Sequence, residues 1–229
     1  MRILALETSA KAVSAALAED GRILASGYQD TGLTHSRTLM PIVEHLFKNT
    51  GLTLADCGAV AVAAGPGSFT GIRIGVSAAK GLAFAADKPV VAVSTLAAMA
   101  RNVAFAGGLV ICAMDARRGQ IYNALFSAEK GVPARLTPDR AISLADLAEE
   151  LRADPRPKTA VGDGAALCLD FLARQGIPCR LAPPHLVMQS AASVALEAEA
   201  LAAAGGLVSP QALEPVYLRP AHAVPLRQR

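Results

Sequence analysis

The sequence lacks tryptophan, and aromatic residues make up only 4% of its 229 positions. Charged residues are also few, at 18%, whereas apolar residues reach 52% and alanine is the most frequent type. A disordered chain has the opposite balance, with high charge and little apolar content. The composition therefore predicts a folded protein with a core of small side chains. The length suffices for one large domain or two small ones.

Long apolar runs and export signals are missing as well. The uncharged stretch Cys57–Ile72 is broken by Gly65-Pro66-Gly67, and no window offers the roughly 18 apolar residues that a membrane span requires. Too few apolar residues precede Glu7 for a signal peptide. The cysteines form no C-x-x-C pair and are expected to be reduced thiols: Cys57, Cys112, Cys168 and Cys179. We expect a soluble, cytoplasmic protein with no membrane association.

Basic residues outnumber acidic ones only slightly. The 22 lysines and arginines against 19 aspartates and glutamates give a net charge of +3, and they form no run. No grouping of aromatic and arginine residues is visible on which an unstacked base could lie. Both features disfavour a nucleic-acid surface carried by this chain alone.

Short apolar segments and turn signals open the chain. Three strands joined by tight turns are predicted at Arg2–Glu7, Val13–Leu17 and Ile23–Tyr28. Helical spacing and a glycine stop predict a helix over His35–Gly51. Buried strands then alternate with helices: strands Ala59–Ala64 and Pro89–Val93, a helix from Thr70 to Ala86, and a helix capped by Ser94. This order predicts a mixed sheet covered by helices.

The pattern restarts in the second half of the chain. Strands are predicted at Leu109–Asp115 and Gln120–Ser127, and CAMDARRGQIYNALF aligns with LALETSAKAVSAAL so that Asp115 matches Glu7. Three helices are predicted after these strands. Ser143 caps the first, Asp163 caps the second, and the third runs from Gln189 to Ala204. We therefore assign residues 1–105 to an N-terminal half and 106–208 to a related C-terminal half. Residues 209–229 form a proline-punctuated tail that could return to the first half.

An acidic residue after the first strand, followed by two hydroxyls, is one way in which a hairpin holds nucleotide phosphates. Backbone N–H groups and the hydroxyls of Thr8 and Ser9 would face the phosphates, and Glu7 would hold a metal or water. Asp115 occupies the matching place in the second half. Local sequence favours the simpler alternative, in which Glu7 ends a strand and Thr8-Ser9 makes a turn.

The glycine-rich segment GPGSFTGIRIG, Gly65–Gly75, permits two interpretations. Its backbone N–H groups could approach an anion where a helix opens at Thr70. Equally, the glycines could allow the strand and the helix to pack tightly. The segment is not a P-loop, because G-K-[ST] is missing, and it contains no G-x-G-x-x-G.

The two helices of the first half carry more apolar positions than covering one sheet face requires. In the second helix, small residues recur every four positions from Gly71 to Ala83, which would let another backbone approach closely. We predict a partner-docking surface formed by His35, Leu39, Ile42, Val43, Leu46, Gly71, Gly75, Ala78, Ala79 and Leu82. The alternative is that the small residues face the protein's own sheet.

The sequence offers no recognisable catalytic group or metal site. No two histidines or cysteines lie at metal-ligand spacing, and no serine sits in a G-x-S-x-G turn. We assign no catalytic residue and no metal ligand.

Five segments together resemble the TsaB (YeaZ) family: GPGSFTGIRIG, LETSAKAVSAAL, HSRTLMPIVEHLF, VSTLAAM and MDARRGQIY. The resemblance covers residues 1 to about 126 and resumes at PVYLRP, Pro215–Pro220. It implies an α/β fold of the actin/Hsp70/sugar-kinase type, in which two related halves each hold a mixed sheet and flanking helices.

The resemblance also implies partners. The transferase TsaD would pair with this chain and move a threonylcarbamoyl group from its adenylate to the adenosine 3′ of the anticodon. The tRNAs concerned read codons that begin with adenine. TsaE is the implied ATPase, and tRNA would be contacted through the complex. The free chain is expected to form homodimers when TsaD is absent.

One departure from TsaD-like proteins concerns their two metal-binding histidines, four residues apart on the helix after the strand Pro89–Val93. This chain has Thr95 and Met99 there, which cannot supply those ligands. The resemblance therefore implies a non-catalytic scaffold without a cofactor of its own, ATP, ADP and metal belonging to the partner subunits.

Under this interpretation the phosphate-binding residues are vestigial: Glu7, Thr8, Ser9 and Asp115. Two other classes stay open. An independent ATP-dependent transferase or kinase of the same fold would show ATP turnover by the chain alone. A peptidase would need a nucleophile or metal site that the sequence does not offer.

Overall fold

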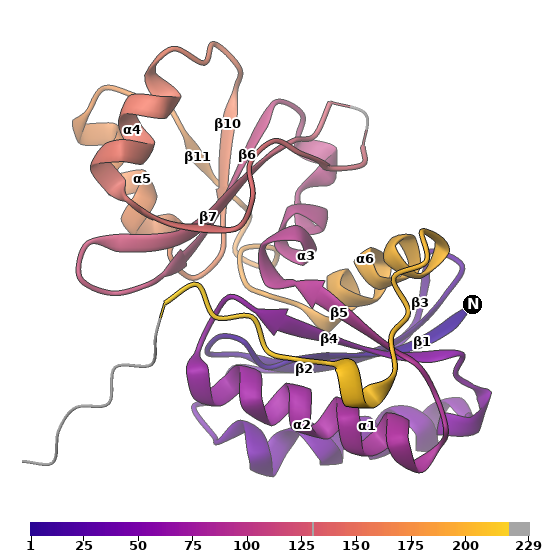
Figure 1. Ribbon diagram of the computed structural model, residues 1–229. Helices are drawn as coiled ribbons and strands as arrows, with labels where there is room; N and C mark the ends of the chain where they lie inside the picture. The colour runs from indigo at the N-terminus through magenta and orange to yellow at the C-terminus, as the bar shows by residue number, and fades with distance from the viewer. Residues whose placement is uncertain (130, 220–229) are drawn as a thin grey trace, which may run out of the picture.

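The structure is a computed structural model that describes residues 1–129 and 131–219. The first half holds a five-stranded sheet in the order β3-β2-β1-β4-β5 (Figure 1). The antiparallel meander β1 (Arg2–Glu7), β2 (Val13–Glu19) and β3 (Arg22–Gln29) is the one that the sequence predicts, and β4 (Ala59–Gly65) and β5 (Val90–Ser94) continue the sheet in parallel.

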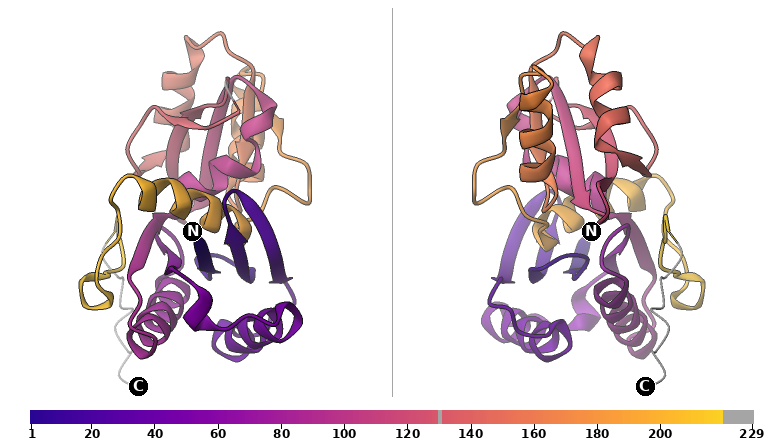
Figure 2. Two further views of the ribbon diagram at one scale, coloured as in Figure 1. Left: turned by 90° about the vertical axis from the view of Figure 1, so that its right-hand side faces the viewer. Right: turned by 90° about the vertical axis from the view of Figure 1, so that its left-hand side faces the viewer.

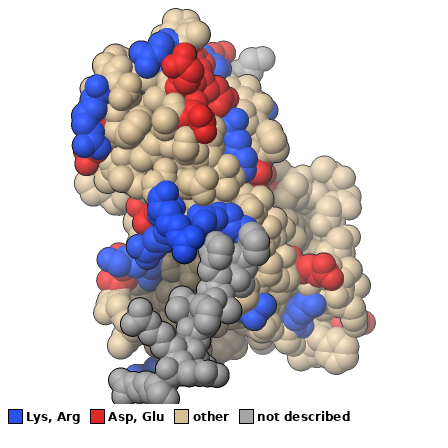
Figure 3. All heavy atoms as spheres, turned by 60° about the vertical axis from the view of Figure 1, so that its left-hand side comes forward, with Lys and Arg blue, Asp and Glu red and all other residues tan. Residues whose placement is uncertain are grey.

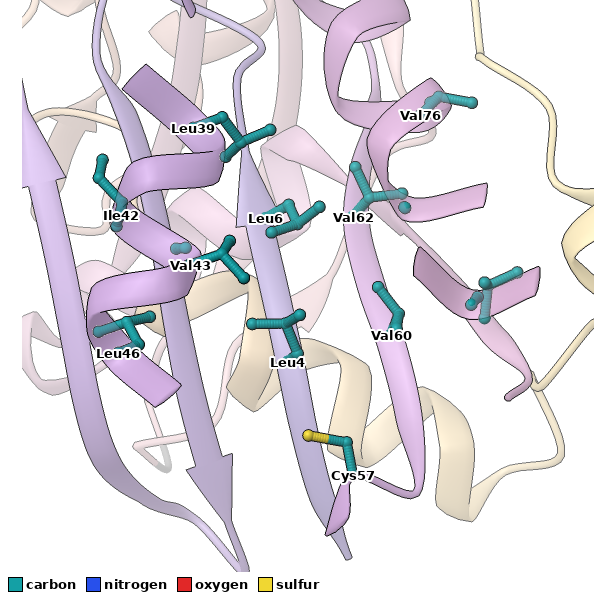
Figure 4. Close-up of a cluster of buried hydrophobic side chains, with 14 of the residues drawn as sticks. Leu4, Leu6, Leu39, Ile42, Val43, Leu46, Cys57, Val60, Val62 and Val76 are labelled. Carbon is teal, nitrogen blue, oxygen red and sulfur yellow. The ribbon is translucent and has the colours of Figure 1, made fainter. Parts of the chain in front are cut away.

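Helices α1 (His35–Thr50) and α2 (Phe69–Ala85) lie side by side on one face of this sheet (Figure 2). Their apolar stripes cover Leu4, Leu6, Val60 and Val62 of the central strands (Figure 4). Both helices begin and end within one residue of the predicted bounds, and Gly51 adopts the left-handed conformation that ends α1, with φ 68°.

The second half repeats the arrangement with a sheet in the order β11-β10-β6-β7-β8 and with β9 paired to β7. Its elements are β6 (Leu109–Asp115), β7 (Gln120–Ser127), β8 (Ala134–Arg135), β9 (Arg140–Ser143), α4 (Leu144–Arg152), β10 (Lys158–Val161), α5 (Ala165–Arg174) and β11 (Arg180–Leu181). β6 pairs antiparallel with β7 and parallel with β10, as β1 does with β2 and β4. The prediction of two related halves is confirmed.

Two of the three predicted helix caps are present. Ser94 and Ser143 each accept a hydrogen bond from a backbone N–H in the first turn of α3 (Thr95–Asn102) and α4, and Ser68, which was not predicted, caps α2 in the same way. The prediction that Asp163 caps a helix is wrong. Gly164 occupies the cap position of α5, and the Asp163 carboxylate instead accepts a hydrogen bond from Gln189 Nε2 at 2.8 Å.

Helix α6 (Ala191–Ala203) does not belong to the half in which the sequence places it. It lies on the face of the first sheet opposite α1 and α2, where Val194, Ala195 and Ala198 pack against Ile3 and Ala61 (Figure 2). Alanines on both sides allow this close approach. Although α6 precedes the boundary predicted at residue 208, it therefore packs with the first half. Helix α3 contacts both halves, the second sheet through Leu96 and Met99 and the first through Ala98.

The described part of the tail, up to residue 219, runs back along the first half. Val208 forms an antiparallel bridge with Val90, and Leu213 is buried in the core beneath α2. Val216 N donates a hydrogen bond to Ala64 O at 2.7 Å. The rest of the predicted tail, 220–229, lies outside the described residues. Single 3₁₀ turns occur at Leu54–Asp56, Ala104–Ala106 and Pro210–Ala212.

Candidate functional site

The glycine turn between β4 and α2 lies directly against the turn between β1 and β2. Ser68 N donates a hydrogen bond to Ser9 O at 2.7 Å, and Thr8 Oγ1 donates one to Gly71 O at 2.7 Å. A Cβ at Gly67 or Gly71 would overlap the backbone carbonyl of Ser9 or Thr8. Of the two interpretations of the glycine segment, the structure therefore supports packing.

The same contacts decide what the predicted phosphate-binding residues can do. The Thr8 hydroxyl is committed to the first turn of α2, and Ser9 N donates its hydrogen bond to a Glu7 carboxylate oxygen. All three side chains are fully buried. Glu7 and Thr8 do not line the cleft between the halves, whereas Ser9 and Asp115 do. This arrangement agrees with the simpler alternative, in which Glu7 ends a strand and Thr8-Ser9 makes a turn.

Glu7 is nevertheless an unusual group. One of its carboxylate oxygens and the Ser9 hydroxyl are buried with no hydrogen-bond partner in the described residues. Burial raises the pKa of Glu7 to about 7, opposed by the hydrogen bond from the Ser9 N–H and reinforced by the negative charge of Asp163. The carboxyl group is thus partly protonated near neutral pH.

The cleft between the halves has a volume of about 400 Å³ and is mostly polar. Asp115 and Asp163 lie on its wall, together with Lys11 and Arg117. Asp115 accepts a hydrogen bond from Arg117 N at 2.7 Å, so that its position depends on the turn between β6 and β7. Two carboxylates without a metal would repel the phosphates of a nucleotide.

The residues present do not fit a metal–nucleotide complex. Thr95 is fully buried, and Met99 packs in the core of the second half, with Sδ on Gly162. Within 1–129 and 131–219, no three histidine, cysteine or acidic side chains come together in a way that could hold a metal ion. The donor set thus lacks the metal ligands that such a complex would need, and the Thr8 hydroxyl is already used inside the protein.

The predicted docking residues are placed mainly in the chain's own core. All but His35, Ala78 and Leu82 are buried, and Leu39, Ile42, Val43 and Leu46 point from α1 into the sheet (Figure 4). A Cβ at Gly75 would overlap Thr8 Oγ1. The row from Gly71 to Ala83 therefore faces the protein's own sheet, which corrects the docking prediction in favour of its alternative.

His35 also has an internal contact, because its Nε2 lies 2.7 Å from Ala10 O and ties α1 to the β1–β2 turn. The outer surface of the two helices is different in character. Apolar side chains remain partly exposed along both helices: Met40, Phe47, Ile74, Ala78 and Leu82. Small residues of α2 are exposed beside them at four-residue spacing: Ser77, Gly81 and Ala85. A Cβ at Gly81 would meet nothing within 4 Å.

A second hollow, of about 300 Å³, is lined by residues that are far apart in the sequence. It brings Phe69 and Tyr217 together with Arg117, Arg118 and Arg219. The expectation that the chain has no aromatic–arginine platform is therefore wrong. Nothing in local spacing could reveal it, because Phe69 and Tyr217 are far apart in sequence; the only signal was the segment PVYLRP, which contains Tyr217 and Arg219.

In the described ranges, no helix combines the length and the apolarity that crossing a bilayer requires.

Comparison with known proteins places the chain in a family. A family model described as TsaD, tRNA N6-adenosine threonylcarbamoyltransferase, matches residues 29–214. The tRNA threonylcarbamoyladenosine biosynthesis protein TsaB of Bacillus subtilis is 37% identical over 167 residues, 73% of each chain. TsaB of Escherichia coli is 32% identical over 222 residues, which cover 96% of this chain and 95% of that one.

Solved structures agree with the sequence relatives. YeaZ from Pseudomonas aeruginosa matches with a TM-score of 0.79 and 29% identity, covering 95% of this chain and 99% of that one. The ROK hexokinase from Thermus thermophilus matches with a TM-score of 0.50 and 14% identity, covering 90% and 100%, which shows the fold alone. The fold is thus the expected one, of the actin-like ATPase and sugar-kinase type. The chain belongs to the TsaB (YeaZ) family of tRNA threonylcarbamoyladenosine biosynthesis proteins.

Proposed function

We propose that this chain is a non-catalytic subunit of the machinery that makes threonylcarbamoyladenosine in tRNA. It pairs in the cytoplasm with a TsaD-type subunit, which transfers the threonylcarbamoyl group to the adenosine 3′ of the anticodon. TsaE joins as the ATPase, and ATP, ADP and metal are held by these partners. Membership of the TsaB family supports the role in tRNA threonylcarbamoyladenosine synthesis. The chemistry of the cleft supports the assignment of ATP, ADP and metal to the partner subunits.

The observation that carries the proposed docking is the outer surface of α1 and α2. Partly exposed Met40, Phe47, Ile74 and Leu82 provide apolar area, and exposed Gly81 lets a second backbone approach. Apolar side chains gathered on one face are typical of a surface that another protein covers. The docking surface is therefore this outer face, and the buried residues Leu39, Ile42, Val43 and Leu46 only support it from below.

A partner built on the same fold would present a comparable helix pair, so that two α1–α2 faces could meet in a four-helix contact. The same reasoning predicts that the free chain forms homodimers when TsaD is absent. Because one surface serves both contacts, TsaD and a second copy of this chain should compete for it.

The test is size-exclusion chromatography of this chain mixed with its cognate TsaD, followed by a reconstituted tRNA modification assay. Gly81→Arg places a large charged side chain on the exposed face and should abolish both the complex and the modification. Ala166→Arg makes the same kind of change on the exposed face of α5, in the other half, and should leave both intact.

Circular dichroism should show that both variants remain folded. A folded Gly81→Arg variant that pairs normally with TsaD would show that the interface lies elsewhere. Turnover of ATP by the purified chain alone would instead support an independent transferase or kinase.

A further inference from the structure

We propose that the hollow lined by Phe69, Tyr217, Arg117 and Arg118 binds one unstacked nucleotide of an RNA chain, with the base on the rings and the phosphate on the arginines. The choice of RNA rests on the proposed function, since the family acts in tRNA modification.

The aromatic side of the hollow is exposed yet fixed in place. Phe69 is 37% exposed and Tyr217 39%, and their ring centroids lie 5.1 Å apart with an interplanar angle of 34°. Arg73 holds both rings: its guanidinium carbon lies 3.8 Å from the centroid of Phe69, and its Nε donates a hydrogen bond to the Tyr217 hydroxyl at 3.0 Å. Arg73 covers one face of Phe69 without lining the hollow, so that Phe69 and Tyr217 form its aromatic side.

The backbone under these rings is well anchored. Phe69 is the first residue of α2, and Tyr217 follows Val216, whose N–H donates to Ala64 O at 2.7 Å. A preformed pair of rings loses little conformational entropy when a base stacks on it.

The basic side of the hollow is the turn between β6 and β7. Arg117 and Arg118 both have positive φ, 66° and 57°, so two consecutive side chains project from a tight turn. The Arg117 side chain is 85% exposed and has one ion-pair contact, with Asp115 at 3.5 Å. Arg118 is exposed and has neither an ion pair nor a hydrogen bond within the described ranges. Arg219 braces this turn, because its Nη1 donates to Ala116 O at 2.7 Å.

The two sides meet in one hollow with no acidic lining among residues 1–129 and 131–219. Lysine and arginine side chains also gather on this side of the molecule, where the two halves meet (Figure 3). Stacking surfaces next to arginines are how proteins hold single-stranded bases and their phosphates. A duplex offers no free base face and would not fit this chemistry.

The neighbouring cleft argues for a nucleotide within a chain rather than for a free nucleoside triphosphate. It adjoins the hollow at Ala116 and Arg117 but is lined by Asp115 and Asp163. A polyphosphate extending into it would meet these carboxylates, whereas a phosphodiester carries a single charge that the arginines can pair.

The experiment measures fluorescence anisotropy of a labelled, unmodified tRNA anticodon stem–loop titrated with the full chain at low salt. Phe69→Ala and Arg118→Ala should each weaken binding at least fivefold or so, because one stacked base or one phosphate contact is lost. Arg174→Ala, an exposed arginine on α5, is the matched charge control and should have no effect.

Equal affinity of the parent chain, Phe69→Ala and Arg118→Ala would overturn the proposal, as would equal binding of a fully paired RNA duplex. If AMP competes as tightly as the stem–loop binds, the ligand is a free nucleotide and the RNA assignment fails. Pairing with TsaD is read separately by size exclusion. If the chain pairs with TsaD but these variants do not change its RNA affinity, the proposed function stands and the RNA-binding site is refuted.

Discussion

Thr8 and Gly71 are joined by a hydrogen bond of 2.7 Å from the Thr8 hydroxyl to the Gly71 carbonyl, and no Cβ could fit at Gly71 without overlapping the Thr8 backbone. This contact fixes the first turn of α2 on the turn between β1 and β2. It uses one of the two hydroxyls that a phosphate site at this turn would offer.

Gly75→Leu should destabilise the fold rather than merely block docking. A Cβ at Gly75 overlaps Thr8 Oγ1 and lies 3.2 Å from a Val62 methyl group, and a leucine adds further atoms in the same place. Overpacking costs about 1–3 kcal/mol or more where the backbone cannot move. Urea unfolding followed by circular dichroism measures the loss. Gly81→Leu, on the exposed side of α2, is the control and should unfold at the parent's urea concentration or above. A stable Gly75→Leu variant would contradict the packing described for α2.

Stability should fall as the pH rises toward neutrality, because the folded pKa of Glu7 is raised to about 7 by burial. An unfolded glutamate titrates near pH 4.3, so the folded state binds the proton more tightly. The contribution of protonated Glu7 to the free energy of unfolding is therefore fully present below about pH 4. It is lost as the pH rises from about 4 to about 7. The loss in the free energy of unfolding is at most on the order of 4 kcal/mol, because one pKa unit corresponds to about 1.4 kcal/mol.

Glu7→Gln removes this titration and keeps an oxygen for the N–H of Ser9. Urea unfolding at pH 5 and pH 8 should show the parent chain losing more stability than the variant between the two values. Identical pH profiles would mean that Glu7 stays charged in the folded protein.

Leu213→Ala should destabilise the whole first half, although the residue lies in the tail. Leu213 is 1% exposed and belongs to the core under α2. Truncating a buried leucine lowers the free energy of unfolding by about 2–5 kcal/mol, depending on how far the surrounding side chains fill the cavity. Thermal unfolding measures this loss as a lower melting temperature. Gln211→Ala, an exposed neighbour, should change the melting temperature little.

The isolated chain should bind ATP weakly or not at all. The Thr8 hydroxyl and the Ser9 N–H are already used inside the protein, and the cleft presents Asp115 and Asp163 to any phosphate. Titration calorimetry with ATP and Mg²⁺ checks this, and micromolar affinity would show that the cleft still serves a nucleotide.

The sequence alone determined the features that depend on near neighbours. The strands from Arg2 to Gln29, the stop at Gly51 and the caps at Ser94 and Ser143 follow from alternation, glycine conformation and hydroxyl groups within a few residues. The match between Glu7 and Asp115 indicated two related halves for the same reason, because each strand–turn–strand unit is encoded locally.

Only the tertiary structure decided which surface each residue meets. A row of small residues from Gly71 to Ala83 suits a partner or the protein's own sheet equally well, and the contact with Thr8 settled it. Helix α6 is apolar nearly all round, so its sequence does not say which sheet it covers. Phe69 and Tyr217 form one aromatic pair although 147 positions separate them along the chain. Contacts of this kind depend on how distant segments fold back, and no spacing along the sequence records that.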